Sequence, residues 1–222
     1  MVQTLASIDS IHLEEKVNAV SVNDSGDKIL IGDCNGTVFL YSLEHDGQHL
    51  KKSIRLSSPI ISVIWHNEKF LVVDEVDGVH MYNQNGDLQW TFDLEAGGAK
   101  AHIQHQIVVL DGIGTLRLLT FDGKEHPVKY RQIISFQPLQ DGFLLLTEQS
   151  EVKKINSSFE EIFSREQRGD IGEDIVHYGK GRNSSWFVAR EGHALVPGDE
   201  EALEIEFFLD DQRVSRSEIV GR

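Results

Sequence analysis

Short apolar runs separated by turn-forming residues dominate the chain from Val17 onward. An apolar run, a turn and a second apolar run recur in the segments KILIGDCNGTVFLYS, KFLVVDEVDGVHMYN, QIVVLDGIGTLRLLT, GFLLLTEQSEVKKIN and SWFVAREGHALVPG. Helical periodicity is absent from windows longer than about ten residues. The pattern therefore predicts strands joined by tight turns, with central strands that are covered on both faces.

The segments repeat with a regular period. When the ends of the first runs are aligned, the residues at equivalent positions are Asp33, Asp74, Asp111, Thr147 and Arg190. The successive spacings are 41, 37, 36 and 43 residues. A period near forty, with four strands in each unit, is typical of the blades of a β-propeller.

The turns fit this interpretation. Between the two runs lie Asn35-Gly36, Asp77-Gly78, Ile113-Gly114 and Glu191-Gly192, and after the second run lie Asp46-Gly47, Asn85-Gly86, Asp122-Gly123 and Pro197-Gly198. Most of these residues tolerate the positive φ angles of tight hairpins. A further apolar stretch precedes each pair and another follows it. Residues 157–167 fit either a short helix or the outer strand of the fourth unit.

The sequence thus predicts an all-β fold, a β-propeller of about five recognisable four-stranded blades in a domain over residues 1–209. The blades are expected near residues 17–56, 60–94, 99–132, 133–164 and 173–208. We expect residues 4–12 to form an outer closing strand, and residues 210–222 to form a tail or the start of a further blade. Three arrangements remain open: part of a larger propeller, a five-bladed ring with a tail, or a ring that a partner completes with its own strands.

The repeats resemble those of the WD-repeat and quinoprotein-like β-propeller superfamilies over roughly residues 3–209. NGDLQWTFDL is similar to the outer-strand repeat of the quinoprotein-like group, in which a turn glycine precedes a tryptophan, here Gly86 and Trp90. No Gly-His dipeptide precedes the inner strands and no Trp-Asp ends the third strands, so the repeats depart from the usual WD pattern. The resemblance implies a rigid fold that binds other proteins through its loops.

Charge and cysteine content narrow the function classes. The formal net charge is −15, from 36 acidic residues against 21 Lys and Arg, which disfavours binding to nucleic acid or to an anionic membrane. Cys34 is the only cysteine, so no internal disulfide can form. With no basic and apolar leader at the N-terminus, these features favour a cytoplasmic protein.

Few residues have the spacing that catalysis or metal binding requires. His102 and His105 form an H-x-x-H pair, but residues three apart on a strand point to opposite faces. Cys34 has no basic neighbour in sequence, and neither a nucleophile elbow nor a phosphate-binding glycine loop is present. The sequence therefore predicts neither an enzyme nor a cofactor.

Acidic residues gather at the turns between the second and third strands of the predicted blades. The candidate binding residues are Asp33, Asp74, Glu75, Asp77, Asp111, Glu148 and Glu191. Aspartates at such turns commonly cap backbone N–H groups. As an acidic rim, these residues would instead attract a basic protein segment. Trp90 and Phe92, on one face of an outer strand, are a candidate apolar patch.

From these observations we expect a non-catalytic scaffold that binds protein partners through a loop face and an acidic rim, with a partner that supplies a basic segment or completing strands. The alternative is a small-molecule-binding or hydrolytic propeller that uses acids in its central channel.

Overall fold

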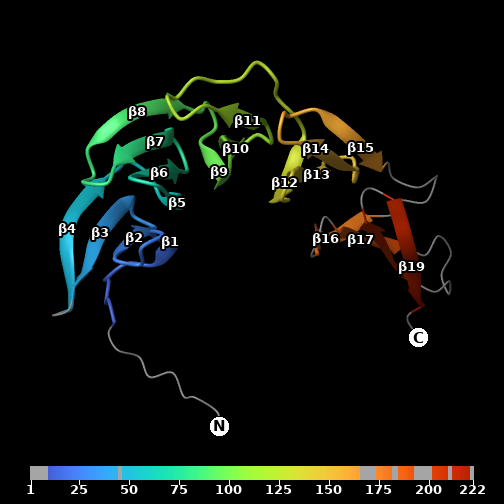
Figure 1. The fold of residues 1–222 in the computed structure, drawn as a ribbon, viewed down its shortest axis with the longest axis horizontal. Coiled ribbons are helices and arrows are strands. Elements are labelled where there is room, and N and C mark those ends of the chain that lie inside the picture. The colour runs from blue at the N-terminus through green and yellow to red at the C-terminus, as the bar shows by residue number, and fades with distance from the viewer. Residues whose placement is uncertain are drawn as a thin grey trace, which may run out of the picture. The chain divides into compact units, whose positions relative to one another are not determined.

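The computed structural model describes residues 10–44, 47–165, 174–181, 185–192, 202–209 and 212–220. Regular structure within these residues consists of β-strands, arranged in antiparallel sheets whose strands follow one another in chain order (Figure 1). No helix among these residues could cross a membrane. The chain divides into two compact units, residues 1–127 and 128–222, with the boundary beside Pro127. The sequence pattern predicted one domain over residues 1–209.

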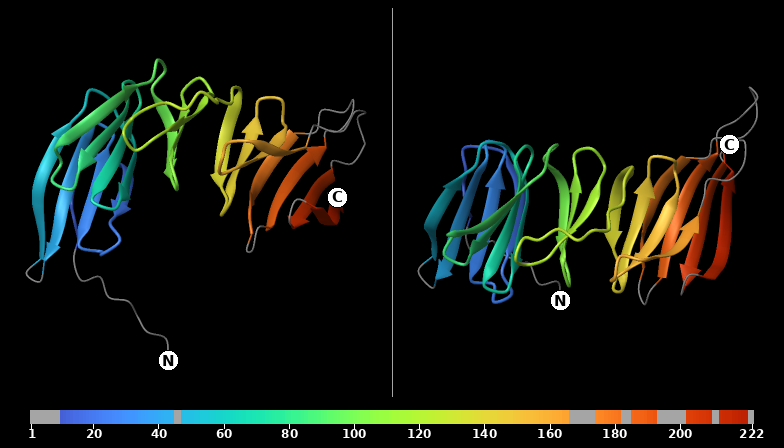
Figure 2. Two further views of the ribbon diagram at one scale, coloured as in Figure 1. Left: turned by 45° about the horizontal axis from the view of Figure 1, so that its top comes forward. Right: turned by 90° about the horizontal axis from the view of Figure 1, so that it is seen from above.

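The first unit contains three sheets. The first sheet comprises β1 (Val17–Val22), β2 (Lys28–Asp33), β3 (Thr37–Glu44) and β4 (Gly47–Arg55), and the second comprises β5 (Ile60–His66), β6 (Lys69–Asp74), β7 (Gly78–Asn83) and β8 (Leu88–Asp93). The third sheet has only β9 (Gly98–Ile103), β10 (Ile107–Asp111) and β11 (Leu116–Leu119). Figure 2 shows the up-and-down course of β1 to β4.

The second unit contains two four-stranded sheets. One comprises β12 (Ile133–Pro138), β13 (Gly142–Thr147), β14 (Val152–Asn156) and β15 (Glu161–Arg165). The other comprises β16 (Asp174–Lys180), β17 (Ser185–Gly192), β18 (Ala202–Leu209) and β19 (Gln212–Val220). Within the range 157–167, β15 is an outer strand rather than a helix, and residues 166 and 167 lie outside the described residues.

The same irregularity marks the first strand of every sheet. A register shift follows the pairs Val17↔Asp33, Ile60↔Asp74, Gly98↔Asp111, Ile133↔Thr147 and Ile175↔Arg190. The second members of these pairs are the five residues that the sequence alignment placed at equivalent positions. The structure therefore confirms that the repeat was aligned in the correct register.

The core lies where consecutive sheets pack face to face. Between the first and second sheets, Leu30 and Val38 pack with Phe70 and Val72; between the second and third, Leu71 and its neighbours pack with Ile107, Val109 and Leu119. The four residues Phe70–Val73 are all fully buried, so β6 is covered on both faces. This explains why its sequence is a continuous apolar run rather than an alternating one.

Packing between β12–β15 and β16–β19 follows the same plan. The ring of Trp186 stacks on that of Phe208 at a centroid distance of 3.9 Å, and Phe163 meets both rings edge-on. Leu144 and Val152 complete this core. The two sheets are thus held by an aromatic cluster, whereas the cores of the first unit are mainly aliphatic.

The third sheet departs from the expected four strands. After β11, residues 120–126 form a turn with one isolated bridge, Leu119↔Glu125, and the backbone N–H of His126 donates to the carbonyl oxygen of Leu118 at 2.8 Å. Pro127 follows, and it has no N–H with which to extend a ladder. The predicted outer strand of the blade at 99–132 is therefore absent.

Two expectations for the last sheet are wrong. Residues 212–220 form neither a tail nor the start of a further blade; they are β19, paired along β18. Glu191-Gly192 is not a hairpin turn, because β17 continues through both residues and pairs with Leu203 and Ala202. In the expected closing strand at 4–12, residues 4–9 lie outside the described residues and 10–12 have no regular structure.

Candidate functional site

The aspartates that end the second strands hold the following turns together. Asp33, Asp74 and Asp111 are 2%, 0% and 2% exposed. In each turn, Oδ1 accepts hydrogen bonds from backbone N–H groups of the next few residues: from Asn35 and Thr37 on Asp33, and from Ile113 and Thr115 on Asp111. The turn glycines Gly36, Gly78 and Gly114 have positive φ, which explains the recurring glycine.

Asp74 has the richest set of partners. Its Oδ1 accepts from Ser58 Oγ at 2.7 Å and from the N–H groups of Val76 and Asp77, while its Oδ2 accepts from His80 Nε2 at 2.6 Å. Burial alone would raise the pKa of Asp74, but the hydrogen bonds from His80, Ser58 and the turn outweigh it and lower that pKa well below the ordinary value.

Asp111 has a cation in the position that His80 holds beside Asp74. Arg117, six residues after Asp111 as His80 is after Asp74, donates from Nε to Asp111 Oδ2 at 3.1 Å and from Nη1 to Glu125 Oε1 at 2.7 Å. Burial alone would lower the pKa of Arg117, but the hydrogen bonds to Glu125 and Asp111 outweigh it and raise that pKa. Arg117 thereby ties the irregular segment after β11 to the turn.

These contacts remove three aspartates from the predicted acidic rim and give them the capping role instead. Asp33, Asp74 and Asp111 are buried and engaged by backbone N–H groups, so they cannot present charge to a partner. Three of the predicted acids do face solvent: Glu75 and Asp77 in the first unit, and Glu148 in the second. The backbone of Glu191 belongs to β17, and its side chain lies outside the described part of the chain.

Two exposed apolar side chains on the same turns were missed from the sequence. Val76 and Ile113 are 58% and 62% exposed, and each stands two residues after a turn aspartate. An apolar residue at the tip of a tight turn, where the side chain has nothing to pack against, is the signal that would have identified them. Together with Glu75 and Asp77 they form a surface that we call the turn rim.

Both turns of the turn rim contact the backbone at Gly97, in the segment between β8 and β9. A Cβ on Gly97 would stand 1.7 Å from the carbonyl oxygen of Glu75, so the chain at Gly97 passes directly against the 75–77 turn. The carbonyl of Gly97 in turn accepts from the N–H of Gly112 at 3.1 Å. The turns that carry Val76 and Ile113 are therefore held on either side of residue 97.

The same backbone link recurs in other blades. In the first four blades, the N–H of the residue after the aligned position donates to the carbonyl of the residue just before the first strand of that blade. The pairs are Cys34–Lys16 at 2.9 Å, Glu75–Pro59 at 3.0 Å, Gly112–Gly97 at 3.1 Å and Glu148–Gln132 at 2.8 Å. Each of these turns is thus anchored at both ends.

The two residues of the candidate apolar patch are partly exposed. The buried parts of Trp90 and Phe92 pack on the core between the second and third sheets. Trp90 Nε1 donates to the carbonyl oxygen of Phe121 at 3.0 Å, and a Cβ on Gly123 would press on the indole ring. Trp90 thereby secures the segment after β11.

The histidine pair does not lie on one strand. His102 is in β9, whereas His105 is exposed in the turn after it. Among the described residues, no group of three or more His, Cys, Asp or Glu side chains is placed to hold a metal ion.

Comparison with solved structures identifies the fold, whereas comparison of the sequence finds no match. No protein-family model and no curated protein matches the sequence. BamB from Moraxella catarrhalis is similar in structure with a TM-score of 0.62 and 12% identity, over 94% of this chain and 78% of BamB. The chain has the β-propeller fold.

Two further similar structures concern Nup159. The N-terminal domain of Nup159 matches with a TM-score of 0.65 and 12% identity, over 91% of this chain and 61% of that one. A chain in the S. cerevisiae complex of a Dbp5 variant bound to Nup159, a Gle1 variant, IP6 and ADP matches with the same TM-score and identity, over 90% and 60%. The present chain thus spans about three fifths of the length of those chains, and at this identity the likeness concerns the fold alone.

Proposed function

We propose that this chain is a non-catalytic, cytoplasmic β-propeller scaffold that binds a protein partner through the turn rim. The partner segment would carry basic residues beside an apolar side chain. We further propose that the chain is related to the WD-repeat or quinoprotein-like propellers, because Gly86 and Trp90 match the quinoprotein-like repeat. A cytoplasmic location is proposed because Cys34 is the only cysteine.

The observation that carries the proposal is the combination of exposure and rigidity at the turn rim. Val76 and Ile113 are mostly exposed, yet their turns are tied down by buried carboxylates and by backbone hydrogen bonds. Rigid apolar side chains lose little conformational entropy on binding, so they make efficient contacts. Glu75 and Asp77 flank Val76 and would attract a basic segment.

The structural comparisons support a partner in general terms. Nup159 belongs to an assembly with other proteins in one of the similar structures, so a chain of this fold class serves there in a protein complex. The alternative of a hydrolytic propeller has less support, because Asp33, Asp74 and Asp111 already use their carboxylates to hold the turns.

Site-specific photo-crosslinking in the cells that express the protein tests the proposal. A photoreactive residue would replace Val76 in one variant and Ile113 in another, with the control at Val20, which is as exposed as Val76 but lies in β1. We expect one partner to crosslink from both rim positions and not from Val20. That partner, once purified, should bind the wild type directly.

Charge variants complete the test. Glu75→Lys with Asp77→Lys should weaken binding of the purified partner by about tenfold or more, and binding to the wild type should weaken as salt rises. If the partner crosslinks equally from Val20, or binds the charge variant as tightly as the wild type, the turn rim is not the binding surface.

A further inference from the structure

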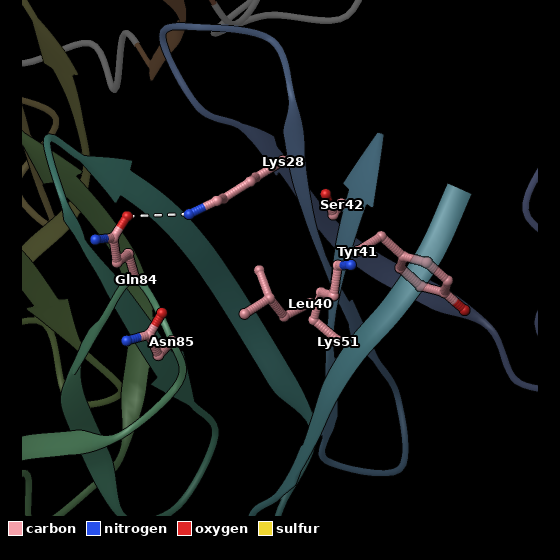
Figure 3. Close-up of a pocket in the computed structure, with 7 residues that line it drawn as sticks. All are labelled: Lys28, Leu40, Tyr41, Ser42, Lys51, Gln84 and Asn85. Atoms are coloured by element: carbon pink, nitrogen blue, oxygen red, sulfur yellow. Dashed lines mark hydrogen bonds between the residues drawn. The ribbon is translucent and has the colours of Figure 1, made fainter. Parts of the chain in front are cut away.

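A pocket of about 270 Å³ opens between the first and second sheets, away from the turn rim. Its lining residues are Lys28 from β2, Leu40, Tyr41 and Ser42 from β3, Lys51 from β4, and Gln84 and Asn85 from the turn between β7 and β8. Figure 3 shows Lys28 reaching across the opening to Gln84, with Leu40 directed between them and the ring of Tyr41 turned away.

Lys28 is the central cation of the pocket, and its hydrogen bond and its ring contact are with neutral side chains. Its Nζ donates to Gln84 Oε1 at 3.0 Å and stands 6.0 Å from the ring centroid of Trp65. An ammonium group has three N–H donors, so the contact with Gln84 leaves two for a ligand. The exposed carboxylate of the neighbouring Asp27 acts on Lys28 through its charge, but in the described part of the chain no carboxylate is hydrogen-bonded to Lys28. A half-buried ammonium in this situation favours the approach of an anion.

Other lining groups add donors around this cation. Lys51 Nζ is 2.7 Å from Glu44 Oε1, but both side chains are about half exposed, and such pairs are weak and readily exchanged. The side chain of Asn85 is exposed at the mouth of the pocket, and its amide can donate two hydrogen bonds. Leu40 supplies an apolar floor.

From this arrangement we propose that the pocket binds a small organic oxyanion, a short-chain carboxylate or phosphate, with Lys28 as its anchor. The volume lies near the lower limit of small-molecule pockets, which suits a ligand of metabolite size. The apolar floor favours an anion with a short carbon skeleton. The site lies in the first unit where β2 begins and β7 ends, whereas the turn rim follows the ends of β6 and β10, so the site is separate from the proposed partner surface.

Titration by NMR, with backbone amides as the readout, tests this inference at constant ionic strength. The probes are succinate, inorganic phosphate and the neutral analogue succinamide. We expect succinate to shift the amides of residues 28, 42, 84 and 85 with a Kd on the order of 1–10 mM, since few contacts form in a half-open site. A response to succinate but not to inorganic phosphate would identify a carboxylate ligand, and the reverse would identify a phosphate.

Variants distinguish a site from general charge screening. Lys28→Gln should raise the Kd about tenfold or more, because the anchoring charge-assisted hydrogen bond is lost, and Asn85→Ala should raise it by a smaller factor. Lys124→Gln, at an exposed lysine of the first unit, should leave the Kd unchanged. The inference fails if neither anion saturates, if succinamide binds as tightly as succinate, or if Lys28→Gln and Asn85→Ala, both folded, bind like the wild type.

Discussion

His80 Nε2 and Asp74 Oδ2 lie 2.6 Å apart with both side chains buried, at the point where β6 turns into β7. The contact joins a third-strand residue to the carboxylate that organises the preceding turn. Ser58, before β5, donates to the other oxygen of the same carboxylate. The Asp74 carboxylate therefore binds the segment before β5, the turn after β6, and β7. This charge should therefore influence the stability of the whole unit.

The first prediction concerns how the stability of the fold depends on acidic pH. The folded-state pKa of Asp74 is below its ordinary value of 3.8, so the ionised carboxylate stabilises the fold above that value. This contribution is lost as the pH falls from about 4 toward the folded-state pKa. Asp74→Asn should lower the unfolding free energy by about 2 kcal/mol at neutral pH. Denaturant unfolding of both proteins across acidic pH should show the gap narrowing below about pH 4; a gap that does not change with pH would contradict the prediction.

The second prediction compares neighbouring serines. Ser58 is buried and donates to Asp74, whereas Ser57 is exposed and donates to Asp77. Ser58→Ala should cost about 1–2 kcal/mol of unfolding free energy, since a buried carboxylate loses a donor. Ser57→Ala should cost less than about 0.5 kcal/mol. Urea denaturation of both variants gives the comparison, and equal costs would show that burial does not decide the strength of these bonds.

A third prediction concerns the core. Leu71 is fully buried in β6, so Leu71→Ala should cost about 2–4 kcal/mol through lost burial and a residual cavity. Val22, half exposed at the end of β1, provides the control, and Val22→Ala should cost less than about 0.5 kcal/mol. Similar chemical-denaturation midpoints for the two variants would argue against the packing of the second sheet on the third.

The fourth prediction separates backbone strain from steric contact. Gly97 and Gly26 have φ angles of +63° and +73°, but a Cβ would collide with the backbone of Glu75 only at Gly97. Gly26→Ala should cost about 1 kcal/mol, the usual cost of a left-handed residue with a side chain. Gly97→Ala should cost at least about 2 kcal/mol more, because the turn rim must move. Thermal unfolding measures the stability difference, and chemical shifts of residues 75–77 report the movement. Equal stability losses without shifts at the rim would disprove the close approach.

Much of the fold could be predicted because the repeat shows in short stretches of sequence, as apolar runs separated by turns. Each second strand is an apolar run that stops at a polar residue, and aligning the ends of these runs placed Asp33, Asp74, Asp111 and Thr147 in the correct register. A turn glycine follows the three aspartates, whereas Ser150 takes the positive φ in the turn after Thr147. The last blade misled the prediction because Glu191-Gly192 resembles a turn. In the structure both residues pair with β18, and partner strands far along the chain are not visible in a local pattern.

The site was less predictable for a physical reason. An aspartate at a turn has the same sequence signature whether it faces solvent or caps N–H groups, and only the position of the neighbouring backbone decides. Asp77 and Asp74 illustrate this: they are three residues apart, yet one is exposed and the other fully buried. The pocket around Lys28 was also beyond sequence analysis, because Gln84 approaches from a different blade.

The backbone link between each turn and the start of its blade has an evolutionary consequence. Its donors belong to Cys34, Glu75, Gly112 and Glu148, four positions occupied by three different residue types, and its acceptors to Lys16, Pro59, Gly97 and Gln132. Because the link uses only main-chain atoms, mutation can replace most of these side chains without breaking it. Proteins that share such backbone links can therefore diverge until their sequences no longer show their common origin, while they keep the same fold.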